Sequence, residues 1–172
     1  GISRRLQTQG AVVSPGHDPS HLEGIEVLVY SSAVQPHESE LVQARARGIT
    51  VISRGELLAA VADDKQLIGV AGAHGKTTTS GMAAQLLVEA GWDPTVIVGG
   101  MMLSFGTNAR PGRGAYLVAE TDESDGSFLH LSPQVAIVTN VDREHLNHYD
   151  TFDRLVEAFR QFVGQIVPGG TF

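Results

Sequence analysis

The sequence predicts a doubly wound α/β fold with mostly parallel sheets, and two observations support this. Short apolar runs alternate with segments of helical periodicity along nearly the whole chain, an order typical of parallel sheets. Residues 25–32 form an almost unbroken apolar run, as expected for a strand buried on both faces. We therefore expect strands and helices to alternate in this way along nearly the whole chain.

The expected elements of the first part follow this alternation. In chain order they are a helix at 1–10, strands at 11–17 and 25–32, a helix at 38–48, a strand at 49–53 and a helix at 54–62. Gly48 closes the second helix. Ser53 and Glu56 match the S-x-x-E capping box, which predicts that the third helix begins there. The chain opens on a helix, whereas such folds usually open on a strand, so we expect a piece of a longer protein.

The second part continues the pattern. Its expected elements are a strand at 66–72, a helix at 76–90, strands at 95–100, 115–120 and 135–141, and a helix at about 151–163. The first of these helices is expected to bury one face, made of Met82, Ala83, Leu86, Leu87 and Ala90. The last is expected to bury a stripe made of Phe152, Leu155, Val156, Phe159 and Val163.

The composition is that of a folded, acidic domain. Hydrophobic residues make up 42% of the 172 residues, charged residues 18%, and the formal net charge is −7. The negative charge argues against nucleic acid as a partner, and the absence of cysteine excludes disulfides and thiolate chemistry. No apolar run is long enough for a membrane span, and no secretory leader is visible. We expect a cytoplasmic protein without a membrane partner; nothing indicates its oligomeric state.

The stretch VAGAHGKTTTS at residues 70–80 has the pattern of a phosphate-binding loop. A strand that enters a helix through a glycine-rich turn points backbone N–H groups and the positive end of the helix dipole at one spot. Gly72 and Gly75 allow the turn, Lys76 would reach the β- and γ-phosphates, and the Thr77 hydroxyl would bind Mg²⁺. Val70 replaces the first glycine of the usual eight-residue motif. The alternative is a glycine-rich turn with a solvated lysine.

Acidic residues follow the run at 115–120, where a metal-holding carboxylate is expected. Glu120 ends that run and is our predicted metal ligand, because ligands gather at the carboxyl ends of strands. For Glu123 and Asp125 an exposed acidic turn is an equal alternative. His145 follows the next strand, and its spacing alone leaves a ligand role undecided, since Mg²⁺ prefers oxygen ligands.

These stretches, with YSSAV and ARGITVISRGELLA upstream, resemble the Mur ligases of bacterial peptidoglycan synthesis over essentially the whole chain. The histidine before GKTTT, E-x-DESD-x-SF and TN-x-x-x-x-H indicate the branch that joins L-alanine to UDP-N-acetylmuramate. The resemblance implies an ATP-dependent amide ligase that forms an acyl phosphate and then releases ADP and phosphate. It also implies roles in cell-wall biogenesis, cell shape and cell division.

The resemblance implies a partial Rossmann-like, UDP-substrate-binding domain at 1–65 and the front part of a P-loop ATPase domain at 66–172. It also implies the following residue roles. ATP would be bound by Gly72, Ala73, His74, Gly75, Lys76, Thr77 and Thr78. The catalytic residues would be Lys76, Glu120 and His145, and Mg²⁺, or Mn²⁺, would be held by Thr77, Glu120 and His145. The substrates would contact Ser31, Ser32, His74, Asn108, Asp122 and Glu123.

Two alternatives remain open at this point. One is the family's ligase that recycles murein tripeptide, which shares the loop histidine. The other is a non-catalytic ATP-binding module derived from such an enzyme. The family's first glycine-rich loop and its third domain have no counterpart in these residues, so we expect this stretch alone to be inactive.

Overall fold

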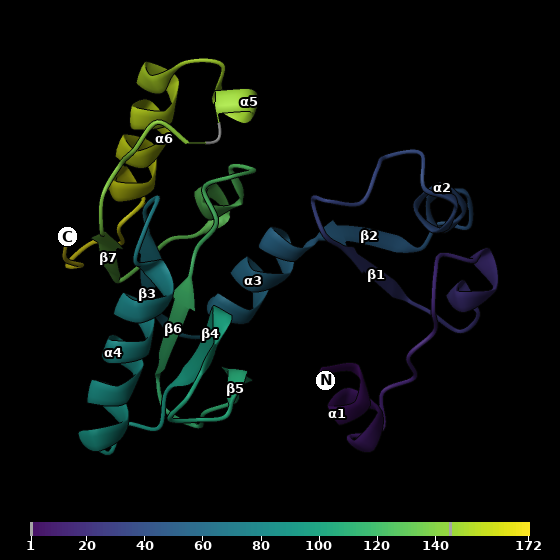
Figure 1. The fold of residues 1–172 in the computed structure, drawn as a ribbon, viewed down its shortest axis with the longest axis horizontal. Coiled ribbons are helices and arrows are strands. Elements are labelled where there is room, and N and C mark those ends of the chain that lie inside the picture. The colour runs from purple at the N-terminus through teal and green to yellow at the C-terminus, as the bar shows by residue number, and fades with distance from the viewer. Residues whose placement is uncertain (1, 145) are drawn as a thin grey trace. The chain divides into compact units, whose positions relative to one another are not determined.

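The computed structural model describes residues 2–144 and 146–172. The described residues fall into two compact units, whose bounds along the chain are Gly1–Arg54 and Gly55–Phe172 (Figure 1). None of the helices in these described ranges is both long enough and apolar enough to cross a lipid bilayer.

The first unit is built around two parallel strands. Its elements are α1 (Ile2–Thr8), η1 (Pro19–Leu22), β1 (Val27–Tyr30), α2 (Ser39–Ala46) and β2 (Thr50–Ser53). β1 and β2 pair in register from Val27 with Thr50 to Tyr30 with Ser53. A small core of Leu22, Leu41 and Ala44 joins η1 to α2.

Two expectations for this unit are wrong. Residues 11–17 form no strand, because Pro15 and the left-handed Gly16 turn the chain and Val12 stays exposed. The run at 25–32 is not buried on both faces either. Val27 and Val29 are exposed and alternate with less exposed neighbours, because among the described residues β1 has only β2 as a paired strand. An apolar run thus predicted strand content here but not the burial of the strand.

The second unit contains a five-stranded sheet in the order β5-β4-β6-β3-β7. Its elements are α3 (Arg54–Ala62), β3 (Gln66–Ala71), α4 (Lys76–Glu89), β4 (Thr95–Met102), β5 (Thr107–Arg110), β6 (Tyr116–Glu120), η2 (Ser127–His130), β7 (Val135–Val138), α5 (Leu146–Tyr149) and α6 (Phe152–Gly164). All neighbouring pairs are parallel except β4 with β5. The predicted doubly wound, mostly parallel fold is confirmed, although the short polar strand β5 was not predicted.

Helices cover both faces of this sheet (Figure 1). Leu67 and Leu117 belong to a core that contains α6 and η2, with α3 packed against it. Their chain neighbours Ile68 and Val118 point the other way, into a core with Ala84 of α4. The carboxyl ends of β3, β6 and β7 therefore meet between two helical layers.

The two long helices differ in how well their buried faces were predicted. In α6 the buried residues include Leu155 and Phe159, as expected. In α4 the expected face is right only in part. Ala83 and Leu87 pack against the core as expected, but Met82 and Leu86 are 57% and 72% exposed, and the fully buried residues are the small Ser80 and Ala84. Small side chains let α4 approach the sheet closely, so hydrophobicity alone did not indicate which residues of α4 are buried most deeply.

Candidate functional site

The loop between β3 and α4 needs both of its glycines. Gly72 has φ +128°, and a Cβ there would collide with Thr139 Oγ1 and lie 2.9 Å from the carbonyl oxygen of Asn140. Gly75 has φ +82° and is the residue from which α4 begins. Both conformations favour glycine over any residue with a side chain. The glycines therefore serve the tight path of this loop.

The end of β7 holds the loop through its Thr-Asn pair. Asn140 Oδ1 accepts from the His74 N–H at 3.0 Å, and Asn140 Nδ2 donates to the His74 carbonyl at 2.9 Å. Thr139 Oγ1 donates to the same carbonyl at 2.6 Å, and the Ala73 N–H donates to the Asn140 carbonyl at 3.2 Å. Sequence reasoning did not assign this role to Thr139 and Asn140; their signal was a polar pair directly after a buried strand.

These bonds determine where an anion would sit. The N–H groups of Ala73 and His74 already donate to Asn140. The first hydrogen bond of α4 runs from the Thr79 N–H to the Gly75 carbonyl, so the N–H groups of residues 76–78 have no acceptor inside the helix. The first turn of α4 therefore presents backbone donors that are not used within the helix, at the end where the helix dipole also favours negative charge.

Lys76 folds back over this turn. Its Nζ donates to the Gly72 carbonyl at 2.6 Å and to Glu123 Oε1 at 2.7 Å. The side chain is mostly buried, which contradicts the alternative of a solvated lysine. The geometry places a fixed positive charge beside the backbone donors.

Thr77 and Glu120, the two predicted metal ligands within the described residues, lie together. Thr77 Oγ1 donates to Glu120 Oε2 at 2.8 Å, and the Gly99 N–H donates to the same oxygen at 2.8 Å. A Cβ on Gly99 would lie 3.1 Å from Glu120 Oε1, and one on Gly100 would lie 2.9 Å from Thr77 Cγ2. The double glycine of β4, which sequence reasoning missed, therefore makes room for both side chains.

A hydroxyl beside a carboxylate is a donor set that suits Mg²⁺, which prefers hard oxygen ligands. Within residues 2–144 and 146–172 no cluster of three or more His, Asp or Glu side chains is arranged to hold a metal ion. The predicted ligand His145 lies outside the described residues. The fit to Mg²⁺ therefore rests on the two oxygen donors of Thr77 and Glu120.

The acidic turn after β6 is ordered rather than solvated. Asp122 Oδ1 accepts from the Ser124 N–H and Asp125 Oδ1 from the Ser127 N–H, both at 2.9 Å. Glu123 is buried, so the alternative of an exposed acidic turn is wrong for this residue. The signal that sequence reasoning lacked was a cationic partner, since Lys76 lies 47 residues away.

Tyr149 of α5 fixes the same turn. Its hydroxyl donates to the Glu123 carbonyl. Burial, followed by the charges of Glu123, Asp125 and Asp122, raises the pKa of Tyr149 to about 12. The phenol therefore stays protonated and remains a donor at physiological pH.

The remaining predicted residues are spread over both units. The ring of His74 is exposed, and its Nε2 lies 3.4 Å from Asp142 Oδ2. The Arg143 backbone N–H and then His74 lower the pKa of Asp142 below its ordinary value. Thr78 is in the first turn of α4, Asn108 is in the edge strand β5, and Ser31 and Ser32 follow β1 in the first unit.

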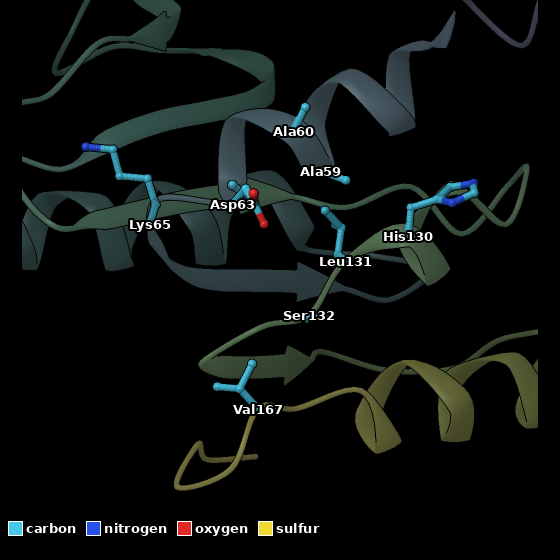
Figure 2. A pocket seen from close by; sticks show the side chains of 9 residues that line it. Ala59, Ala60, Asp63, Lys65, His130, Leu131, Ser132 and Val167 are labelled. Carbon is cyan, nitrogen blue, oxygen red and sulfur yellow. The ribbon is translucent and has the colours of Figure 1, made fainter.

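A pocket of about 440 Å³ lies elsewhere, near the amino ends of β3 and β7 (Figure 2). Lys65 precedes β3 and Ser132 precedes β7, whereas the phosphate loop follows the carboxyl end of β3. In Figure 2 the side chains of Lys65 and His130 point away from each other, and Lys65 Nζ donates to the Gly114 carbonyl at 2.8 Å. The polar groups do not converge, so this pocket is not the candidate site.

Both parts of the chain match models of one protein family. Residues 70–172 match the Mur ligase middle domain, and residues 1–66 match the Mur ligase family, catalytic domain. The chain is 51% identical over 164 residues to UDP-N-acetylmuramate–L-alanine ligase of Aquifex aeolicus, which covers 95% of this chain and 36% of that protein. The chain thus spans about a third of the length of the curated relatives it matches.

Two solved structures are similar to the chain over nearly its full length. The UDP-N-acetylmuramate–alanine ligase of Thermotoga maritima has a TM-score of 0.86 at 29% identity, covering 94% of this chain and 38% of that chain. The UDP-N-acetylmuramate:L-alanyl-γ-D-glutamyl-meso-diaminopimelate ligase of Neisseria meningitides has a TM-score of 0.89 at 26% identity, covering 98% of this chain and 58% of that chain.

Proposed function

Because the chain belongs to the Mur ligase family, we propose that it is part of an ATP-dependent ligase that joins L-alanine to UDP-N-acetylmuramate in the cytoplasm. The observation that carries this proposal is the assembly of Lys76, Thr77 and Glu120 around the first turn of α4. The relative from Aquifex aeolicus, at 51% identity, carries the name of this activity and supports the choice of substrates. Residues 1–65 would contribute to the UDP-substrate domain and 66–172 to the ATPase domain.

In this proposal the first turn of α4 binds the ATP phosphates. The backbone N–H groups of residues 76–78 and the Lys76 ammonium stabilise the charge that builds up on the phosphate oxygens during transfer. Thr77 and Glu120 would hold a divalent ion, Mg²⁺ or Mn²⁺, with His145 as a further proposed ligand. When bound, that ion would neutralise the repulsion between the phosphates and the substrate carboxylate.

The chemistry balances as two displacements. A carboxylate oxygen of UDP-N-acetylmuramate attacks the γ-phosphorus of ATP, and ADP leaves. The amine of L-alanine then attacks the acyl carbon, loses a proton and displaces phosphate to leave an amide. In the proposal Ser31 and Ser32 of the first unit contact the UDP substrate, and His74, Asn108 and Asp122 of the second unit are further proposed substrate contacts.

A second candidate is favoured by one observation. The ligase from Neisseria meningitides, whose name specifies a tripeptide, has a TM-score of 0.89 to this chain. The fold of these residues is thus compatible with a peptide as the amine substrate. The two candidate functions differ in their amine substrate, which is L-alanine in the first and a tripeptide in the second.

The test is an assay of phosphate release by the full-length protein with MgATP and UDP-N-acetylmuramate. The proposal predicts release that requires L-alanine and is not supported by L-alanyl-γ-D-glutamyl-meso-diaminopimelate. Release with the tripeptide alone would establish the second candidate instead. MgATP binding without release in any mixture would indicate a non-catalytic module and contradict both.

A further inference from the structure

Glu123 is a buried carboxylate in contact with the lysine of the phosphate loop. Its Oε1 lies 2.7 Å from Lys76 Nζ, and the two side chains are 2% and 17% exposed. Glu123 comes from the turn after β6, not from the loop or from α4. The structure therefore supplies Lys76 with a partner from a separate segment of the chain.

The contact determines which way the ammonium group points. A lysine ammonium has three N–H donors. One donates to the Gly72 carbonyl at 2.6 Å and one to Glu123 Oε1 at 2.7 Å. A single donor is left for a phosphate oxygen. A lysine side chain has four flexible methylene groups and loses considerable conformational entropy when it is ordered, so these two acceptors do that ordering before any nucleotide arrives.

The backbone of Glu123 is held firmly enough to serve this purpose. The Tyr149 hydroxyl and the Gly126 N–H both donate to the Glu123 carbonyl. The Phe128 N–H donates to the Asp122 carbonyl at 3.1 Å, and the Phe128 side chain is fully buried in the core. The acidic turn is thus tied to the α6 side of the sheet, which gives the carboxylate a fixed position.

We propose that Glu123 is a positioning residue for Lys76: it orients the ammonium so that its remaining N–H faces the nucleotide phosphates. This inference rests on the proposed nucleotide site. It also gives Glu123 a role different from the substrate contact that the sequence resemblance implied. Because a carboxylate near the phosphates repels them, the benefit comes from orientation and not from charge.

The test is a double-mutant cycle on MgATP affinity in the full-length protein, measured by calorimetric titration. The four proteins are the parent, Glu123→Ala, Lys76→Ala and the double variant. Glu123→Ala is expected to weaken MgATP binding about tenfold, the loss expected for one charge-assisted hydrogen bond. In the Lys76→Ala background the same substitution is expected to change the dissociation constant by less than about twofold, because no ammonium remains to be positioned. An equal loss in both backgrounds would overturn the inference.

Two further variants keep the test decisive if Glu123→Ala folds poorly. Glu123→Gln keeps an oxygen acceptor without the charge, so its affinity is expected to stay within about threefold of the parent. A tenfold loss in Glu123→Gln with an intact fold would contradict orientation as the cause. Asp125→Asn removes one charge from the same turn and keeps the acceptor for the Ser127 N–H, so it is the matched control and should bind like the parent.

The outcomes separate this inference from the proposed function. A parent protein that does not bind MgATP would overturn the proposed nucleotide site, and the positioning role with it. A parent that binds MgATP and gives an additive cycle would overturn only the role of Glu123.

Discussion

Each unit contains a carboxylate that accepts hydrogen bonds from cationic or imidazole side chains at 2.7 Å, but the two sites differ in burial. In the second unit Glu123 and Lys76 are 2% and 17% exposed. In the first unit Glu40 accepts from His17 and His21, and the three side chains are 15%, 49% and 30% exposed. Distance alone therefore does not distinguish them. Water screens the first-unit site, whereas the buried pair is expensive to break.

The largest expected effect is the loss of stability when the buried Lys76–Glu123 pair is broken. Lys76→Met removes the ammonium that lies 2.7 Å from the buried Glu123 carboxylate, and we expect a loss of stability of about 3–5 kcal/mol. Adding Glu123→Gln should recover most of that loss, because a neutral amide is less costly to bury than a carboxylate that has lost its ammonium. Thermal unfolding of the full-length variants measures both. A Lys76→Met protein that melts like the parent would contradict the burial argument.

A second prediction compares a glycine from each unit. Gly72→Ala forces a Cβ against Thr139 and Asn140 at φ +128°, and we expect a cost of about 1–3 kcal/mol with loss of MgATP binding. Gly24 also has positive φ, but a Cβ there meets nothing within 4 Å. Gly24→Ala should therefore cost about 1 kcal/mol and leave nucleotide binding intact. Equal effects of Gly72→Ala and Gly24→Ala on MgATP binding would contradict the assignment of the nucleotide site to the loop that contains Gly72.

A smaller effect is expected where a hydrogen bond is lost but its acceptor keeps another donor. Tyr149→Phe removes the hydroxyl bond to the Glu123 carbonyl, which still accepts from the Gly126 N–H. We expect a loss of about 0.5–1.5 kcal/mol in unfolding free energy, measured by urea denaturation. A change in MgATP affinity in this variant larger than that in Glu123→Ala would mean that the turn, not the carboxylate, acts on the site.

The smallest expected effect on stability comes from the exposed contacts of Glu40 with His17 and His21 in the first unit, and this effect depends on pH. The hydrogen bond to Glu40 raises the pKa of His17 above its ordinary value of 6.5. Burial acts to raise the pKa of Glu40, but hydrogen bonds from His17 and His21 leave it below its ordinary value of 4.5. The contribution of His17 to folding stability is complete below pH 6.5 and is lost as the pH rises through its raised pKa. The contribution of Glu40 to folding stability is present above pH 4.5 and is lost as the pH falls through its lowered pKa.

Both contributions are therefore present together between pH 4.5 and pH 6.5. In Glu40→Gln, an NMR titration should show the pKa of His17 moving down toward 6.5, because its acceptor has lost its charge. Glu38 also lies near His17 and raises its pKa, so Glu38→Gln is the matched control with a smaller shift. An unchanged His17 titration in Glu40→Gln would contradict the assigned contact.

The sequence predicted the parts of the site that depend on local pattern. The order strand, glycine turn, helix placed Lys76 and Thr77, and the end of an apolar run placed Glu120. Contacts between distant segments were not predictable in this way. The Lys76–Glu123 pair spans 47 residues and the Asn140–His74 bonds span 66, and no local periodicity encodes such pairs.

Element burial shows the same limit. The helix α6 buries large residues at helical spacing, including Leu155 and Phe159, so these buried positions could be predicted from the sequence. The helix α4 buries Ser80 and Ala84, because a close approach to the sheet requires small side chains. The run at 11–17 has apolar residues but no paired strand within residues 2–144 and 146–172. In each case the sequence pattern indicated which secondary structure a segment favours, but packing against other segments decided which of its residues are buried.

The most direct test of the central claim, that the first turn of α4 binds the nucleotide phosphates, is amide hydrogen exchange on the full-length protein with and without MgATP. We predict slower exchange for the amides of residues 75–78 and unchanged exchange for residues 11–25 of the first unit. Unchanged exchange at residues 75–78 under conditions where MgATP binds would contradict the claim.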